Sequence, residues 1–477
     1  MVLSTLFQKN LTKAFPSMSN LIIESIKKQQ ERDESSVATE NLTEGSVFRS
    51  LLKYAAPMIV TSILQAVYSI VDIWIAGIYI GGSGISGISN GSLIMNLITQ
   101  IAIGITVGGN VLISQYFGSG METDRRKAVG TLLVSSLIMS VFFGFIFYVS
   151  ARPLLVFLNA PALEEAVVYV QICSMGMLFI FGYNALSAIL RAAGNSSAPM
   201  YTIALATAVN IVLDYIFIAE MDMGVAGAAI GTATAQGVSF FTALIYTARH
   251  GGDYGFDSKE LKVYGEKLKK ILRLGFPIAL QWTIASVSWL AVAFLINLYG
   301  VDVSAGNGIS NKIKDFCQLF ITAMTSAAAT MAAQNLGAGK FDRAREVLNS
   351  CLKTTIIMAF IIIAIVEAAA PFIVSFFNKD PIICGHAVTN IRIEIIAQIF
   401  YAGFLSYNIL ATACGDTIFV MANSFLNCIV VRLILAFALE SVMGIMGVYL
   451  ACMIAPASSV PVGWYYCKRE KWKKRLV

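Results

Sequence analysis

The sequence predicts an all-α membrane protein whose twelve transmembrane helices form two pseudo-symmetric six-helix bundles. Three observations lead to this fold class. Hydrophobic residues make up 57% of the chain and occur in long unbroken runs. Only 13% of the residues are charged, about half the share found in a typical soluble domain. Several segments of the first half also return, in the same order, in the second half.

The predicted helices are apolar runs long enough to cross a bilayer, which takes roughly 20 residues. In the first half these runs cover about 51–77, 88–117, 128–149, 164–189, 199–218 and 224–247. In the second half they cover about 270–299, 303–336, 352–377, 385–411, 417–438 and 443–466. Each half therefore contributes an even number of spans, and the lipid bilayer is the principal expected partner.

The two halves repeat at a spacing of about 220 residues. LLKYAAPM at 51–58 returns as ILRLGFPI at 271–278, and SQYFGSG at 114–120 returns as AQNLGAG at 333–339. Because each half has an even number of helices, both enter the membrane from the same side, as parallel repeats do. Twin bundles around a central cleft are typical of secondary transporters.

The repeat also predicts the domain boundaries. The expected order is a cytoplasmic tail at 1–45, a first lobe at 46–250, a cytoplasmic linker at 251–268, a second lobe at 269–467 and a basic cytoplasmic tail at 468–477. Pro57 and Pro277 lie early in the first helix of each lobe, where loss of a backbone hydrogen bond favours a bend. The alternative is the ordinary tolerance of membrane helices for proline.

Basic residues are concentrated in alternate loops, and this pattern predicts the orientation. They lie between helices 2 and 3, 4 and 5, 6 and 7, and 8 and 9, and in the C-terminal segment KREKWKKRLV. Both termini are therefore expected in the cytoplasm. The net charge of +6 follows from this topology and an anionic inner leaflet, so no nucleic-acid partner is implied.

The sequence contains no pattern expected of an enzyme. The eight cysteines are scattered through predicted helices without metal-like spacing and are best explained as reduced packing thiols. The two histidines, His250 and His386, fall in predicted loops or at helix ends. Since no nucleophile triad or metal-protease motif occurs, we expect no catalytic residues and no cofactor.

Two acidic residues inside predicted spans mark a candidate site in the first lobe. Asp72 lies in helix 1 and Asp214 in helix 5. Intramembrane acids cost roughly 2.5–3.5 kcal/mol each and usually line a cavity. Asn210 lies one turn before Asp214 on the same helix face. At a rise of 1.5 Å per residue, these side chains and Thr232 of helix 6 reach a similar depth in the outer half of the lobe.

The second lobe lacks these acids. At the repeat spacing Asp72 meets Val292, and Asp214 meets Leu435. This asymmetry favours a functional role over a shared structural one. Two carboxylates in a low dielectric cannot both stay charged and unsolvated, so the pair suits H⁺. With an amide and a hydroxyl oxygen it also suits Na⁺, the only metal ion expected. The alternative is that Asp72 is solvated near the outer interface.

Several segments resemble the MATE family, the multidrug and toxic compound extrusion transporters, especially its DinF-like prokaryotic branch. These segments are SIVDIWIAG, RAAGNSSAPM, NIVLDYIFI, GAAIGTATAQ, AQNLGAGKFDRA and ACGDT, within about residues 46–467. The resemblance implies the MATE/MOP-type fold and a monomeric antiporter of the bacterial plasma (inner) membrane. It implies export of amphipathic organic compounds and drugs by alternating access, coupled to H⁺ or Na⁺. The implied cation-binding residues are Asp72, Asn210, Asp214 and Thr232.

The second lobe departs from part of the family pattern. The acidic residue that NorM-like members carry in helix 7 is not evident, and Gln281 is the nearest polar position after Pro277. The alternative function is a flippase for lipid-linked saccharide precursors, which shares the general fold and would need a larger cationic cleft. Lys312 and Arg432 favour this alternative, whereas the acidic first lobe argues against it.

The charged residues of helices 8 and 11 have two interpretations. In the first they are structural, with Lys312 paired to Asp315 and Arg432 paired to Glu394. In the second, Lys312 and Arg432 belong to a basic wall of the substrate cleft, which then has an acidic wall and a basic wall, and Gln281 lies in the same cleft. That cleft would also accept anionic or zwitterionic compounds.

Overall fold

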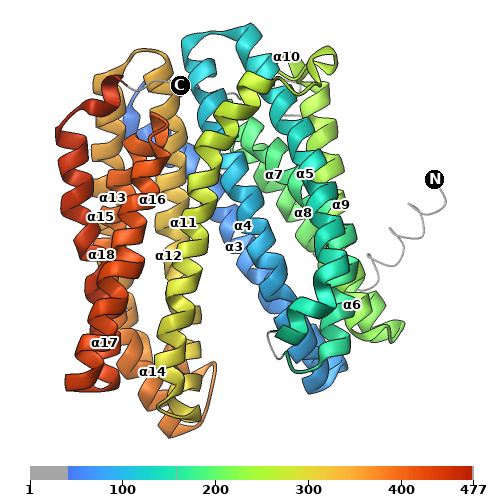
Figure 1. Cartoon of the computed structure of the whole chain (residues 1–477), viewed down its shortest axis with the longest axis vertical. Helices are drawn as coiled ribbons and strands as arrows, with labels where there is room; N and C mark the ends of the chain where they lie inside the picture. The colour runs from blue at the N-terminus through green and yellow to red at the C-terminus, as the bar shows by residue number, and fades with distance from the viewer. Residues whose placement is uncertain (1–40, 158–159, 475–477) are drawn as a thin grey trace. The chain divides into compact units, whose positions relative to one another are not determined.

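The computed structural model describes residues 41–157 and 160–474, and within them the chain is almost entirely helical (Figure 1). Ten of the described helices are long and apolar enough to cross a membrane, and two bent helix pairs raise the number to twelve. The predicted fold class is therefore confirmed. Most of the predicted N-terminal tail, at 1–45, lies outside the described residues.

The described part of the first lobe contains seven α-helices and one π-helix. They are α3 (Val47–Tyr79), α4 (Gly81–Ser119), α5 (Glu122–Phe157), α6 (Leu163–Met175), α7 (Met177–Ala192), α8 (Ser197–Asp214), the π-helix η1 (Tyr215–Glu220) and α9 (Gly224–Arg249). The short helices α10 (Gly251–Tyr254) and η2 (Ser258–Glu260) follow in the predicted linker.

The second lobe repeats this arrangement. It consists of α11 (Gly265–Asn297), α12 (Val301–Gly337), α13 (Phe341–Ser375), α14 (Pro381–Glu394), α15 (Ala397–Ala413), α16 (Thr417–Phe425), the π-helix η3 (Leu426–Val431), α17 (Arg432–Met443) and α18 (Ile445–Lys468), before the terminal turn η4 (Lys471–Lys474).

The fourth span of each lobe is bent. The axes of α6 and α7 differ by 51°, and those of α14 and α15 by 44°. Gly176 separates α6 from α7, and a methyl group added there would lie 3.0 Å from the Cβ of Ala233 in α9. Helices α3 and α11 continue without a break through Pro57 and Pro277. A bend at these two prolines stays a prediction.

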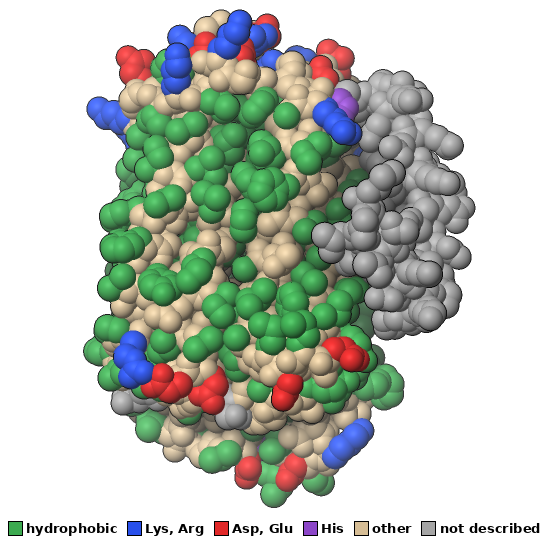
Figure 2. Space-filling model, turned by 90° about the vertical axis from the view of Figure 1, so that its right-hand side faces the viewer, with side chains coloured by type: hydrophobic (Ala, Val, Ile, Leu, Met, Phe, Trp, Pro, Cys, Tyr) green, Lys and Arg blue, Asp and Glu red, His purple; other side chains and the backbone are tan. Residues whose placement is uncertain are grey.

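Apolar side chains face outward between two charged ends. Figure 2 shows hydrophobic side chains over the middle of the visible face, with most charged side chains near its two ends. Phe145 of α5 and Leu290 of α11 are each 70% exposed. Because the helices satisfy their own backbone hydrogen bonds, this arrangement is stable in lipid.

The start of α3 packs against the second lobe. Leu51 and Tyr54 are buried in one cluster with Met331 and Leu336 of α12. In a corresponding way, the first half of α11 packs closely against α4. The start of the first helix of each lobe therefore packs against the other lobe. The predicted lobe boundaries at 46–250 and 269–467 stay a prediction.

The lobes meet most closely near the loops that follow α4 and α12, which we call the basic end. The Gln115 side chain donates to the Ala413 carbonyl across the lobe interface at 2.6 Å. The Gln334 side chain donates to the Ala192 carbonyl at 2.7 Å. The two glutamines lie in the repeated SQYFGSG and AQNLGAG segments. At this end the lobes are therefore joined by two equivalent hydrogen bonds, one donated from each lobe, that the pseudo-symmetry axis relates.

Candidate functional site

The α8 and η1 segment positions the first two predicted site residues. Asp214 is the last residue of α8, and the π-helix η1 begins at the next residue. Asn210 and Asp214 are both fully buried. The Asn210 Nδ2 atom donates to Asp214 Oδ1 at 3.3 Å. π-helical turns of this kind are common at functional positions because they disturb the regular helix locally.

Helix α3 brings Asp72 to the same place. The carboxyl group of Asp72 lies within hydrogen-bonding reach of Asp214 and of the Tyr68 hydroxyl. Tyr68 in turn donates to Thr232 Oγ1 of α9 at 3.1 Å. The four side chains predicted from the sequence are therefore close together, and we call them, with Tyr68, the acidic site.

Three oxygens of the acidic site have no partner. Asp72 Oδ1, Asn210 Oδ1 and Asp214 Oδ2 are buried and accept no hydrogen bond within the described residues. A buried acceptor left in this way costs about 1–3 kcal/mol, and more when it is charged. A proton or a small hard cation would satisfy these oxygens, so the donor set fits H⁺ and Na⁺. That the site binds either ion stays a prediction.

Gly231 allows α9 to approach Asp214. A methyl group added at Gly231 would overlap Asp214 Oδ1, whereas the present glycine leaves the carboxylate room. Gly231 belongs to the GAAIGTATAQ segment, so this glycine shapes the acidic site as well as the packing of α8 and α9.

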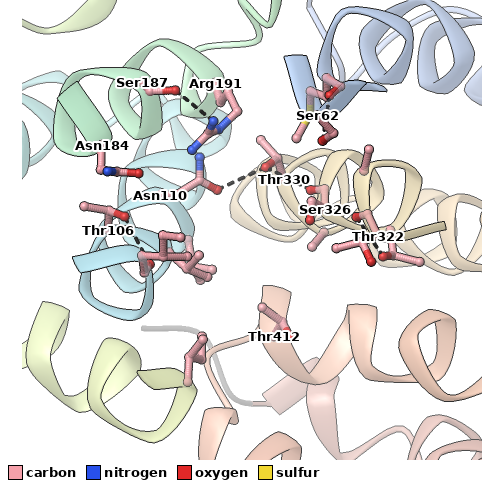
Figure 3. Close-up of a pocket in the computed structure, with 18 of the residues that line it drawn as sticks. Ser62, Thr106, Asn110, Asn184, Ser187, Arg191, Thr322, Ser326, Thr330 and Thr412 are labelled. Carbon is pink, nitrogen blue, oxygen red and sulfur yellow. Dashed lines mark hydrogen bonds between the residues drawn. The ribbon is translucent and has the colours of Figure 1, made fainter. Parts of the chain in front are cut away.

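A cavity of about 360 Å³, lined by both polar and apolar side chains, lies between the lobes (Figure 3). Its wall is made by α3, α4, α7, α8, α11, α12, α15 and α16. Thr330 donates to Asn110 Oδ1 across the lobe interface at 3.0 Å, and Arg191 donates to Ser187 at 2.8 Å. Among the described residues that line it, Arg191 alone is charged. Gln281 lies on this wall, and its contact with substrate stays a prediction.

The predicted pairing of the second-lobe charges is wrong. Glu394 forms its ion pair with Lys314 of α12, and Arg432 instead lies over the Trp289 ring. Lys312 is exposed and forms no ion pair with Asp315 in the part of the chain that the structure describes. The wall residues of the cavity include neither Lys312 nor Arg432.

Two similar helical lobes around a central cavity define the class of two-lobed membrane transporters. The chain belongs to the MatE family, the MATE transporters, whose model matches residues 57–216 and 277–438. The two matched segments begin at the two repeated prolines.

Named relatives and solved structures agree with this family. The "Probable multidrug resistance protein YoeA" of Bacillus subtilis is 26% identical over 73% of this chain and 78% of its own. The "Multidrug export protein MepA" of Staphylococcus haemolyticus is 25% identical over 86% of this chain and 91% of its own. A solved outward-facing MATE transporter of the MOP superfamily has a TM-score of 0.86 at 20% identity. That match covers 92% of this chain and 100% of the solved chain, and it shows the shared fold.

Proposed function

We propose that the protein is a multidrug antiporter that exports amphipathic organic compounds in exchange for H⁺ or Na⁺. The observation that carries this proposal is the acidic site, in which two carboxyl groups meet inside one lobe and three buried oxygens have no hydrogen-bond partner among the described residues. The substrate class rests on the relatives, which are named as multidrug resistance and multidrug export proteins.

Helix α3 connects the proposed ion site to the substrate cavity. Its start packs against the second lobe at Leu51, and its middle lines the cavity at Thr61 and Gln65. Asp72 lies about two turns beyond Gln65. A cation that neutralises Asp72 and Asp214 therefore changes the packing of a helix that also forms the cavity wall.

The proposed cycle is alternating access with competing occupancy. The lobes are joined at the basic end, which we assign to the cytoplasm together with both termini. A cation from outside binds the acidic site, α3 repacks and the substrate leaves outward. The lobes then rock, the cation leaves inward and a new substrate binds. Each inward charge contributes about 2.3 kcal/mol per 100 mV.

We assign the protein to the plasma (inner) membrane as a monomer that needs no cofactor and no catalytic residue. The flippase alternative is not favoured, because the named relatives are multidrug proteins. A channel would need a continuous polar pore, and the cavity wall instead belongs to two lobes joined at one end.

Dye transport in proteoliposomes tests this function. The full chain is reconstituted with tetramethylrhodamine methyl ester, and either a pH gradient or a Na⁺ gradient is imposed. We expect dye accumulation with one of the two gradients and none when both are collapsed. Gradient-independent scrambling of a labelled lipid, or an ohmic current with no dye accumulation, would overturn the proposal.

A glycine substitution tests the geometry of the acidic site. Gly231→Ala should reduce gradient-driven dye accumulation about tenfold or more, because the added methyl group displaces Asp214 from Asn210. The matched control is Gly237→Ala on the same helix, where the new methyl group would meet Phe179 at an ordinary 3.5 Å. Equal transport by the two variants in the same proteoliposome assay would contradict the prediction.

A further inference from the structure

A second buried group of charges lies in the second lobe. It consists of Lys314 of α12, Glu394 of α14 and Arg432 of α17, around Trp289 of α11, and we call it the basic cluster. Lys314, Glu394 and Arg432 are 5%, 3% and 5% exposed. Helices α16–α17 are the repeat of α8, so Arg432 and Asp214 are buried charges on corresponding spans of the two lobes.

The basic cluster carries an excess of positive charge. Lys314 pairs with Glu394, whereas Arg432 forms no ion pair within the described residues. Lys314 Nζ lies 3.9 Å and Arg432 Cζ 4.3 Å from the centre of the Trp289 ring. Lys312 and Asp315 lie nearby and are exposed, and their opposite charges sum to zero. The acidic site and the basic cluster are therefore opposite in sign.

The guanidinium of Arg432 has an unused edge. Its Nη1 atom donates to Ser288 Oγ at 3.4 Å, and its Nε atom is buried without a partner in the described part of the chain. Burying such a charge without a counter-ion is costly. The planar fork of an arginine suits a carboxylate, which accepts two parallel hydrogen bonds from it.

Two helices direct the cluster toward the same side as the substrate cavity. Trp289 follows Trp282, a residue of the cavity wall, by about two turns of α11. Lys314 precedes Thr325, also a wall residue, by about three turns of α12. The faces that line the cavity therefore continue to the basic cluster.

The π-helix η3 turns Arg432 to this side. Val420 lines the cavity, and η3 lies between it and Arg432. A π-helical turn holds one residue more than an α-helical turn. With this extra residue, Arg432 lies about three turns from Val420, on the same side of the span. In a regular α-helix, position 432 would point about one-third of a turn away.

We propose that the basic cluster is an anion subsite, which binds the carboxylate of a zwitterionic or anionic amphipathic substrate through Arg432. Trp289 packs against the aromatic body of the same molecule. The inference rests on the proposed transport function and adds a substrate class to it. The substrate's cationic group is left to the acidic first lobe.

Binding of two dyes that differ in one group tests the subsite. Tetramethylrhodamine has a free carboxylate, and its methyl ester does not. Affinities are measured by fluorescence anisotropy for the full chain in phosphatidylcholine nanodiscs, without an ion gradient. We expect Arg432→Gln to weaken binding of the free acid about tenfold or more, and binding of the ester less than about twofold. The control Arg392→Gln removes an exposed arginine of the same lobe and should change neither affinity.

Equal losses for both dyes, or no loss for either, would overturn the subsite. Should Arg432→Gln not be recovered folded, the wild-type chain gives the test by competition. Benzoate should then displace the free acid and benzamide should not, and equal displacement would overturn the subsite. If the wild-type chain binds the ester but not the free acid, the subsite is wrong while the proposed function stands, because gradient-driven transport of the ester tests that function separately.

Discussion

Asp214→Asn should abolish ion-coupled transport while leaving the folded protein in the membrane. The amide has nearly the same shape as the carboxylate but cannot become charged, so the site loses an acceptor for a cation. Loss of one translocated charge removes about 2.3 kcal/mol at 100 mV, which is about a 50-fold concentration ratio of substrate. Thermal stability should not fall, because Asp214 Oδ2 is a buried oxygen without a partner in the described residues.

Asp72→Asn should have the same effect, because the two carboxyl groups lie within reach of one another. The measurement is dye accumulation in proteoliposomes under the gradient that drives the wild-type chain. Asp302→Asn, at the exposed start of α12, is the matched control and should transport normally. Gradient-driven accumulation that persists in both site variants would refute the assignment.

Much of the acidic site can be predicted from the spacing of its residues along the sequence. Asn210 and Asp214 are one turn apart, and equal depths along helices 1, 5 and 6 bring Asp72 and Thr232 to them. Tyr68 was not predicted, because a tyrosine in a membrane helix is ordinary. The signal available was its position one turn before Asp72 on the same helix face.

The second lobe shows where spacing fails. Lys312 and Asp315 have the spacing of a helical ion pair, yet the buried pair joins Lys314 to Glu394 on another helix. Lys314 lies on the same buried side of α12 as Ile313 and Cys317, so its side chain is inside the lobe. Long-range pairing of this kind depends on how helices pack, and hydropathy carries no information about it.

The direction of Arg432 is hidden from the sequence for a different reason. It depends on the extra residue in η3, and an apolar run such as LNCIVV has no pattern that separates a π-helical turn from an α-helical one. The contacts between lobes are equally hard to predict. The repeat identifies corresponding segments, but it does not indicate that they touch across the pseudo-symmetry axis.

Gly337→Ala should open the basic end. A methyl group added at Gly337 would overlap the backbone carbonyl of Gln115 in α4, which cannot rotate away as a side chain can. The two helices must therefore separate, and the bonds from Gln115 to Ala413 and from Gln334 to Ala192 weaken with them. Overpacking of this kind costs about 1–3 kcal/mol, which shifts the balance between closed and open forms about 5–150-fold.

Hydrogen exchange of backbone amides in 104–120 and 330–339 measures this opening, because separation of the lobes exposes these helix segments to water and favours their local opening. Exchange there should be faster in Gly337→Ala than in the wild-type chain. Gly308→Ala is the matched control on α12, since no atom of the described residues lies within 4 Å of its new methyl group. It should leave exchange at the basic end unchanged and add up to about 1 kcal/mol of helix stability. Identical exchange in all three proteins would mean that the glycine contact does not hold the basic end closed.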